Sequence, residues 1–163
     1  MINLHETKIS QDIPGKKLIV SREFSAPVAK VWRAWTESSL LDQWWAPKPW
    51  KAETKSLDFV TGGLWLYCMV GPAGERHWCR VDIISVEPGK QFRSVAVFCD
   101  EEGTPTNAAP EMKWFAQFEP SESGTKLIAE ISFNTEAEMN AIVQMGFKEG
   151  FTMGLGNLDA LLA

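Results

Sequence analysis

Residues 62–83, GGLWLYCMVGPAGERHWCRVDI, contain two runs of apolar and aromatic residues separated by a turn sequence. Such runs favour strands, and the sequence GPAG at 71–74 is typical of a tight turn. If Gly71 pairs with Arg76 across this turn, the two runs form an antiparallel hairpin. The stretch therefore predicts a β-hairpin that belongs to a larger sheet.

This pairing assigns each hairpin side chain to one of two faces, because strand side chains alternate. One face then carries three cross-strand pairs: Met69 with Trp78, Tyr67 with Arg80, and Trp65 with Asp82. The other face carries Leu64, Leu66, Cys68, Cys79, Val81 and Ile83. Both faces are largely apolar, whereas a sheet with one face in water alternates apolar with polar residues. We therefore expect one face to line an interior and the other to be covered by a partner.

Further strands are expected on both sides of the hairpin. Between Trp50 and Phe133, short strand-like runs alternate with turn sequences, which gives six antiparallel strands in a meander. Residues 16–25 add one strand before the helices. The polar segment 100–110, DEEGTPTNAAP, predicts a mobile loop over one end of the sheet.

Helical periodicity follows the first strand and returns at the end of the chain. Residues 28–35 and 38–45 predict two short helices, and Thr135 with Glu138 forms a capping box that opens a long C-terminal helix. An antiparallel sheet of six to seven strands must curve around this helix to bury both apolar faces. The fold class is therefore α+β.

Glycines recur through the last helix at positions 146, 150 and 154. Each costs about 1 kcal/mol relative to alanine in a helix interior. Two explanations remain open: the glycines admit bulky rings close to the helix, or they leave room for a ligand.

Tryptophan is unusually frequent, with eight residues among 163 and only one tyrosine. Each indole buries roughly 150–250 Å², so the interior contains large, flat, apolar surfaces. A strongly curved sheet and a helix leave space between them, and the rings either fill a core or line a cavity. We expect the helical tryptophans to be scaffold and the strand tryptophans to be cavity wall, the two groups being Trp32, Trp35, Trp44 and Trp45, and Trp65, Trp78 and Trp114.

Length and charge limit the possible functions. A chain of 163 residues is most simply one domain, with residues 1–15 as a polar leader and 16–163 as the domain. A net charge of -5 without a Lys/Arg cluster argues against nucleic acid and anionic membrane surfaces. The leader lacks the apolar stretch of a secretion signal, and no run is long enough to span a membrane, so we expect a cytoplasmic protein without integral membrane association.

Catalytic and metal-binding motifs are sparse. Cys68, Cys79 and Cys99 match no zinc spacing and are expected to be buried, reduced thiols, although Cys68 and Cys79 could pair across the hairpin. The two histidines, His5 and His77, accompany no nucleophile motif, and neither a phosphate-binding loop nor a dinucleotide fingerprint is present. We therefore assign no catalytic residue, metal or cofactor.

Seven separated motifs resemble one family. They are Phe24-Ser-Ala-Pro27, Val31-Trp32-Arg-Ala-Trp35-Thr, Leu40-x-x-Trp44-Trp45, Gly62-Gly63-x-Trp65-x-Tyr67, Val86-x-Pro88, Gly124-Thr125-x-Leu127 and Gly146-Phe147-x-x-Gly150-Phe151. In order and spacing they are similar to the activator of heat-shock protein 90 ATPase homologue-like family, within the START-like (SRPBCC) superfamily. The resemblance covers about residues 19–162. It implies the helix-grip fold and a cavity between sheet and C-terminal helix that binds an apolar small molecule.

The resemblance also implies which hairpin face is inward. In relatives the aromatic residues after the double glycine point into the cavity, so the face with Trp65 and Tyr67 becomes the cavity wall. Further wall candidates are Trp114 on the sheet and Phe151 and Leu155 on the last helix, or these three are ordinary core. The full set of expected ligand-binding residues is Trp65, Tyr67, Met69, Trp78, Arg80, Asp82, Trp114, Phe151 and Leu155.

Two charged residues within this set allow alternatives. Arg80 could hold a carboxylate or sulfate among the rings, or it could form a structural pair with Asp82. The opposite face would be exposed and apolar, so either the inward assignment is reversed or a partner covers this face, for which we expect a homodimer through Leu64, Leu66, Val81 and Ile83.

Three functions follow. The first is binding or carriage of an apolar or aromatic small molecule without catalysis. The second is a protein-interaction module related to heat-shock protein 90 co-chaperones, which would use the exposed sheet face. The third is a cyclase- or hydrolase-like enzyme that uses Arg80, Asp82 or Tyr67 as acid and base groups.

Overall fold

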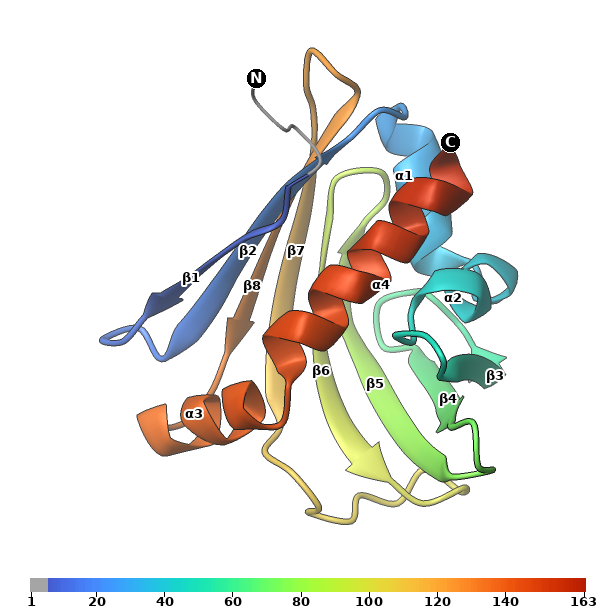
Figure 1. Cartoon of the computed structure of the whole chain (residues 1–163), viewed down its shortest axis with the longest axis vertical. Coiled ribbons are helices and arrows are strands. Elements are labelled where there is room, and N and C mark those ends of the chain that lie inside the picture. The colour runs from blue at the N-terminus through green and yellow to red at the C-terminus, as the bar shows by residue number, and fades with distance from the viewer. Residues whose placement is uncertain (1–5) are drawn as a thin grey trace.

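The structure is a computed structural model that describes residues 6–163. These residues form an antiparallel sheet of eight strands in the order β1-β2-β8-β7-β6-β5-β4-β3, together with four helices (Figure 1). The strands are β1 (Lys8–Asp12), β2 (Lys17–Phe24), β3 (Lys51–Leu57), β4 (Leu64–Val70), β5 (Arg76–Glu87), β6 (Gln91–Cys99), β7 (Met112–Pro120) and β8 (Thr125–Ser132). The helices are α1 (Val28–Thr36), α2 (Ser38–Trp44), α3 (Glu136–Gln144) and α4 (Phe147–Leu162).

The sheet curves around α4, which runs diagonally across its concave face toward α1 and α2 (Figure 1). Alternate residues of β2 and β8 are buried, as expected for strands with one face against a core. Leu155 and Leu158 of α4 are completely buried in the same hydrophobic cluster. The α+β class and the six-stranded meander from β3 to β8 are therefore confirmed.

The expected number of strands was too low. The eighth strand, β1, lies within the segment expected to be a polar leader and pairs with β2 through Ile9 and Val20. A turn at residues 13–16 folds the chain back, with Lys16 in the left-handed region at φ 54°. β1 is an edge strand with one partly buried apolar residue, so its sequence carries little strand periodicity. Residues 1–5 of the expected leader lie outside the described residues.

The expected long C-terminal helix is two helices. The Thr135 cap is confirmed, since its hydroxyl accepts a hydrogen bond from the Glu138 backbone N–H at 3.1 Å. That cap opens α3, however, and the helix ends before Gly146, whose φ of 92° lies in the left-handed region that favours glycine. The helix that packs across the concave face of the sheet is therefore the 16-residue helix α4, without α3.

The hairpin register differs by one residue from the expected pairing. Val70, not Gly71, pairs with Arg76, and the Gly71 N–H donates to the carbonyl of Glu75. The connection is a β-turn closed by a bond from the Gly74 N–H to the Gly71 carbonyl, with Gly74 at φ 89°. A turn followed by a left-handed glycine is the usual three-residue hairpin loop. A one-residue slip moves every side chain of one strand to the other face.

In the observed register, the β5 residues expected on the inner face lie on the outer face, and those expected on the outer face lie on the inner face. The inner face, which is the concave side toward α4, carries Trp65, Tyr67 and Met69 of β4 with Cys79, Val81 and Ile83 of β5. The outer face carries Leu64, Leu66 and Cys68 with Trp78, Arg80 and Asp82. Cys68 and Cys79 therefore lie on opposite sides of the sheet, and all three cysteines are buried and free.

The expected homodimer surface does not exist as one surface. Leu64 and Leu66 lie on the outer face, whereas Val81 and Ile83 are buried on the inner face. A homodimer through some other surface stays a prediction.

The chain covers part of its own outer face. Residues 100–105 fold back against the outer face of β3 to β5, where the Arg80 guanidinium donates to the Gly103 carbonyl at 3.1 Å and the Lys55 ammonium donates to the Glu101 carbonyl at 3.0 Å. Gly103 and Leu66 are buried beside each other. This loop covers Leu66, one of the apolar residues of β4 that face outward.

The glycines of α4 have different surroundings. A Cβ atom on Gly154 would lie 3.2 Å from the Trp45 carbonyl oxygen and 3.5 Å from that of Trp44, whereas one on Gly156 would meet nothing within 4 Å. Gly154 thus allows the helix to approach the backbone at the end of α2, and Asn157 adds a bond to the Ala46 carbonyl at 3.3 Å. At Gly154, α4 therefore comes close to backbone carbonyl groups and not to the indole rings.

We expect Gly154→Val to lower the free energy of unfolding by about 1–3 kcal/mol, because its methyl groups force α4 away from the carbonyls of residues 44 and 45. Gly156→Ala should raise it by about 0.5–1 kcal/mol through helix propensity alone. Urea denaturation of both variants measures the difference. Equal stability of the two variants would contradict the close approach at Gly154.

Candidate ligand-binding cavity

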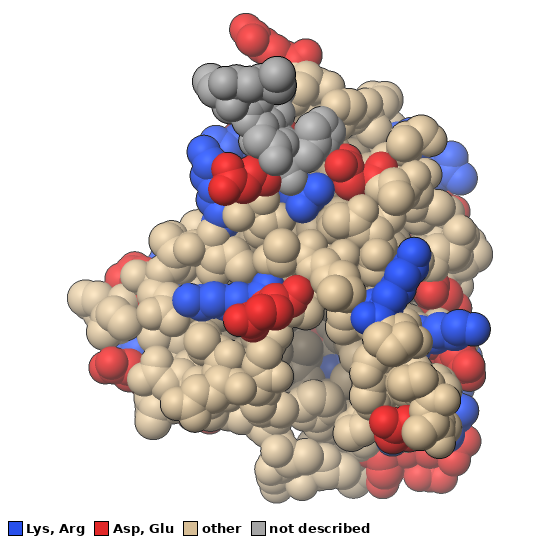
Figure 2. Space-filling view, in the orientation of Figure 1, with Lys and Arg blue, Asp and Glu red and all other residues tan. Residues whose placement is uncertain are grey.

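A cavity of about 290 Å³ lies between the inner face of the sheet and the N-terminal part of α4. Figure 2 shows the surface hollowed below α4, with mostly uncharged residues around the opening. Strands β4 to β7 form its floor, and the α3–α4 junction and the segment around Pro47 form its sides. Within residues 6–163 the lining contains no Lys, Arg, His, Asp or Glu side chain.

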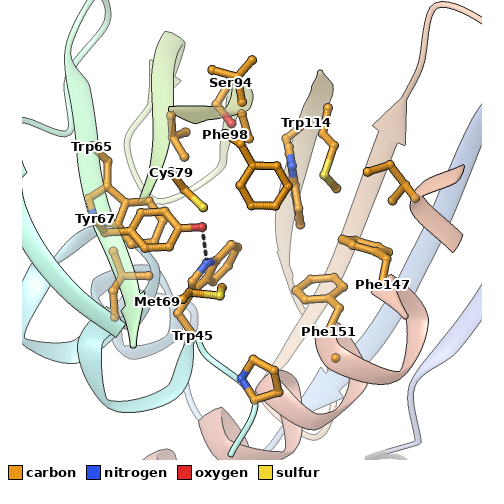
Figure 3. A pocket seen from close by; sticks show the side chains of 18 of the residues that line it. Trp45, Trp65, Tyr67, Met69, Cys79, Ser94, Phe98, Trp114, Phe147 and Phe151 are labelled. Atoms are coloured by element: carbon orange, nitrogen blue, oxygen red, sulfur yellow. Dashed lines mark hydrogen bonds between the residues drawn. The ribbon is translucent and has the colours of Figure 1, made fainter. Parts of the chain in front are cut away.

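The sheet side of the cavity is built by alternation along each strand. Trp65 and Tyr67 of β4 stack with ring centroids 4.1 Å apart, and Met69 continues the same face. Trp114 of β7 stands on the opposite side of the floor and packs edge-on against Phe151 of α4 at 5.3 Å (Figure 3). Flat rings thus enclose the space from two sides.

Trp45 joins these two sides. Its ring lies 5.4 Å from that of Trp65, 5.8 Å from that of Trp114 and 6.2 Å from that of Phe151. Trp35 also lines the cavity from α1, 5.7 Å from Trp45. Both were expected to be scaffold, so the helical tryptophans divide differently: Trp32 and Trp44 belong to the packed core, and Trp35 and Trp45 border the cavity.

The structure brings five of the nine expected site residues to the cavity wall. These five are Trp65, Tyr67, Met69, Trp114 and Phe151. Leu155 is fully buried in the core next to the cavity and does not line it. Trp78, Arg80 and Asp82 lie on the outer face, because the hairpin register assumed for them was wrong by one residue.

The charged residues on the outer face pair with each other. The Arg80 guanidinium donates to both carboxylate oxygens of Asp82, at 3.0 and 2.9 Å, and this bond raises the pKa of Arg80. The Trp78 ring lies beside the cations of Lys55 and Arg76. Of the three groups considered for acid–base chemistry, only Tyr67 remains in the cavity.

Besides the indole N–H groups of its tryptophans, the cavity wall contains three polar groups. The Tyr67 hydroxyl accepts a hydrogen bond from the Trp45 indole N–H at 2.8 Å (Figure 3), and Cys79 is the strand partner of Tyr67 on β5. Burial raises the pKa of Tyr67 well above its usual value and that of Cys79 to about 12, so both stay uncharged at neutral pH. The third polar group is the hydroxyl of Ser94.

Several wall residues were not anticipated from the sequence. They are Trp35, Trp45, Cys79, Ser94, Phe98, Met112 and Phe147. Phe147 lies one helical turn before Phe151, so helical spacing could have indicated it. Cys79 follows from the correct hairpin register. For Ser94, no sequence pattern marks it as different from a serine on an exposed strand face.

Neither a metal cluster nor a membrane-spanning helix is found in the described chain. No three His, Cys, Asp or Glu side chains of residues 6–163 gather as metal ligands. No helix in this range has the length and apolar character needed to cross a bilayer.

Comparisons with known proteins agree with the fold. The family described as activator of Hsp90 ATPase homolog 1-like protein matches residues 25–163. The crystal structure of protein Ms6760 from Mycobacterium smegmatis is 26% identical, with a TM-score of 0.89 and 96% of each chain covered. A protein from Arthrobacter aurescens, solved by NMR, is 27% identical with a TM-score of 0.89, covering 95% of this chain and 90% of its own.

One further structure supports the fold alone. The AHSA1 protein from Silicibacter pomeroyi is 24% identical, with a TM-score of 0.73 over 90% of this chain and 96% of its own. None of the curated proteins matches the chain.

Proposed function

The chain belongs to the activator of Hsp90 ATPase homolog 1-like family, and from its cavity we propose that it binds and carries a compact, apolar, aromatic small molecule. The observation that carries this proposal is the cavity of about 290 Å³, walled by aromatic rings and free of charged side chains within residues 6–163. This volume is at the lower end of the usual range for ligand pockets. The ligand is therefore small.

The shape of the walls favours a planar molecule. Trp65 and Tyr67 present stacked rings on one side, and Trp114 and Phe151 meet edge-on across the floor. A flat ligand can stack on one ring and meet the edge of another, which adds about 0.5–1.5 kcal/mol per aromatic pair to simple burial. Trp65, Tyr67, Met69, Trp114 and Phe151 are our proposed ligand contacts, with Trp45 between them.

Binding rather than catalysis fits the polar groups of the cavity. Tyr67 and Cys79 are held neutral by burial, and a neutral thiol with a pKa near 12 is a weak nucleophile. Arg80 and Asp82, which an acid–base mechanism would need, lie on the outer face. The wall can enclose and orient a molecule by contact.

Isothermal titration calorimetry with naphthalene tests the proposal. We expect one molecule to bind per chain with a dissociation constant on the order of 10 µM, because nearly all of its apolar surface becomes buried. Glucose, which exposes hydroxyl groups on all sides, should give no binding heat. Native mass spectrometry of freshly purified protein should also reveal added mass from a co-purified ligand. Failure of naphthalene to bind to ligand-free protein would overturn the proposal.

A further inference from the structure

Ser94 is an exception among the residues of the cavity floor. It lies on the inner face of β6, between Phe92 and Ala96 along the strand, and only 3% of it is exposed. Its strand partners are Ile83 on β5 and Trp114 on β7. The Ser94 hydroxyl makes no side-chain hydrogen bond to another residue in the range 6–163, yet the residue lines the cavity. An unpaired hydroxyl is therefore placed in an apolar wall (Figure 3).

The Tyr67 hydroxyl differs from that of Ser94 because it already has a protein partner, accepting a hydrogen bond from the Trp45 indole N–H at 2.8 Å. The Cys79 thiol is only a weak donor and acceptor. When a ligand displaces water from the cavity without offering a partner, the Ser94 hydroxyl is left without a hydrogen bond, at a cost of about 1–3 kcal/mol. A ligand oxygen beside Ser94 would supply the missing hydrogen bond. At Tyr67, by contrast, the ligand would have to compete with the Trp45 indole N–H.

The cavity also restricts the charge of its occupant. No charged side chain in the described range lines it, and the nearest candidates from the sequence, Arg80 and Asp82, are paired on the other face. A ligand carboxylate or ammonium would lose its hydration without gaining an opposite charge. The occupant must therefore be uncharged.

We propose that the cavity selects an uncharged aromatic molecule that carries one hydrogen-bonding oxygen, and that Ser94 anchors this oxygen. This assignment rests on the proposed ligand-binding function and narrows its ligand class. Ser94 sets the orientation of the ligand, because it is a wall hydroxyl that can both donate to and accept from a ligand oxygen, whereas the indole N–H groups of Trp35 and Trp114, which also lack a hydrogen bond within residues 6–163, can only donate.

Calorimetry with three matched probes tests the inference: naphthalene, 2-naphthol and 2-naphthoate. We expect 2-naphthol to bind the unmodified protein about tenfold more tightly than naphthalene, which corresponds to one net hydrogen bond. The anion 2-naphthoate should bind at least about 100-fold more weakly than 2-naphthol. Ser94→Ala should remove the advantage of 2-naphthol and leave the affinity for naphthalene within about twofold.

The ligand-free stability of the variant separates ligand binding from a structural role. Ser94→Ala breaks no hydrogen bond to the described protein, so its midpoint of urea denaturation should equal or exceed that of the unmodified protein. Ser94→Cys, which keeps the shape but weakens the bond, should give an intermediate preference for 2-naphthol and provides a second variant if Ser94→Ala folds poorly.

The possible failures are distinct. Equal affinity of the unmodified protein for naphthalene and 2-naphthol, or an advantage that survives both substitutions, overturns the role of Ser94 and leaves the proposed function standing. Tight binding of 2-naphthoate overturns the restriction to uncharged ligands. If neither naphthalene nor 2-naphthol binds, both the inference and the proposed function fail.

Discussion

Replacement of Trp44 by alanine is expected to lower the free energy of unfolding by about 3–5 kcal/mol. The side chain is 1% exposed, and its ring packs at 5.0 Å from Trp35 and 5.3 Å from Trp45. Its indole N–H donates to the Ala34 carbonyl at 2.9 Å, which ties α2 to α1. Truncation removes these contacts and leaves a void that the surrounding backbone cannot fill.

Trp78→Ala is the matched control for this substitution. Trp78 is only partly buried on the outer face, beside the cations of Lys55 and Arg76. We expect its truncation to lower the free energy of unfolding by about 1–2 kcal/mol, because the side chain is only partly buried and its cation–π contacts are weak. The free energies of unfolding of the two variants, measured by urea denaturation, should thus differ by at least about 1 kcal/mol. Equal losses would show that Trp78 is as deeply packed as Trp44, contrary to the observed hairpin register.

Filling the cavity is expected to remove ligand binding with little effect on stability. Ala96 lies on the inner face of β6, paired with Val81 and Met112, and lines the cavity. In Ala96→Phe the added ring takes the place of one ligand ring. The loss of roughly 100 Å² of ligand burial corresponds to about 2.5 kcal/mol, or about a hundredfold in affinity. Naphthalene titration by calorimetry measures this loss.

Val95→Phe provides the control for Ala96→Phe. Val95 is the preceding residue of the same strand and lies on the outer face, opposite Asp82 and Lys113. The same aromatic side chain is therefore added on the other side of the sheet, and naphthalene affinity should stay within about twofold. Loss of binding in both variants would indicate general disruption of β6 rather than occupation of the cavity.

The parts of the fold that follow from local patterns were predictable from the sequence. Alternation and turn residues gave the meander between Trp50 and Phe133, and Thr135 marked the start of α3 through its side chain. The cavity itself could be expected, because a curved sheet and a helix enclose space that aromatic residues line. Trp65 was placed on its wall because the family resemblance implies that face, and Trp114 was a further wall candidate; the structure has both there.

Predicting the register of β5 required knowing the backbone partner of Gly71. Whether Gly71 pairs with Glu75 or Arg76 changes the loop by one residue, and both choices are compatible with a Gly-Pro-Ala-Gly turn. The energy that decides between them is distributed over the whole sheet, where Cys79 and Val81 must face the core. Arg80 was consequently assigned to the cavity, although it binds the Gly103 loop on the outer face.

The position of Trp45 at the cavity could not be predicted from local sequence patterns, for a different reason. Its ring meets residues from β4, β7 and α4, which are distant in sequence. Likewise, the break at Gly146 resembles an ordinary helical glycine in the sequence. Its positive φ separates α3 from α4, which run in different directions (Figure 1).

Within residues 6–163 the open sheet has two edge strands, β1 and β3, each without a strand partner along one side. Such edges invite strand addition by another copy of the chain. Exposed charged side chains occupy both edges: Lys8 on β1, and Lys51, Glu53 and Lys55 on β3. An incoming β-strand would have to desolvate these charges, so the edges resist sheet-to-sheet aggregation even though the sheet does not close into a barrel.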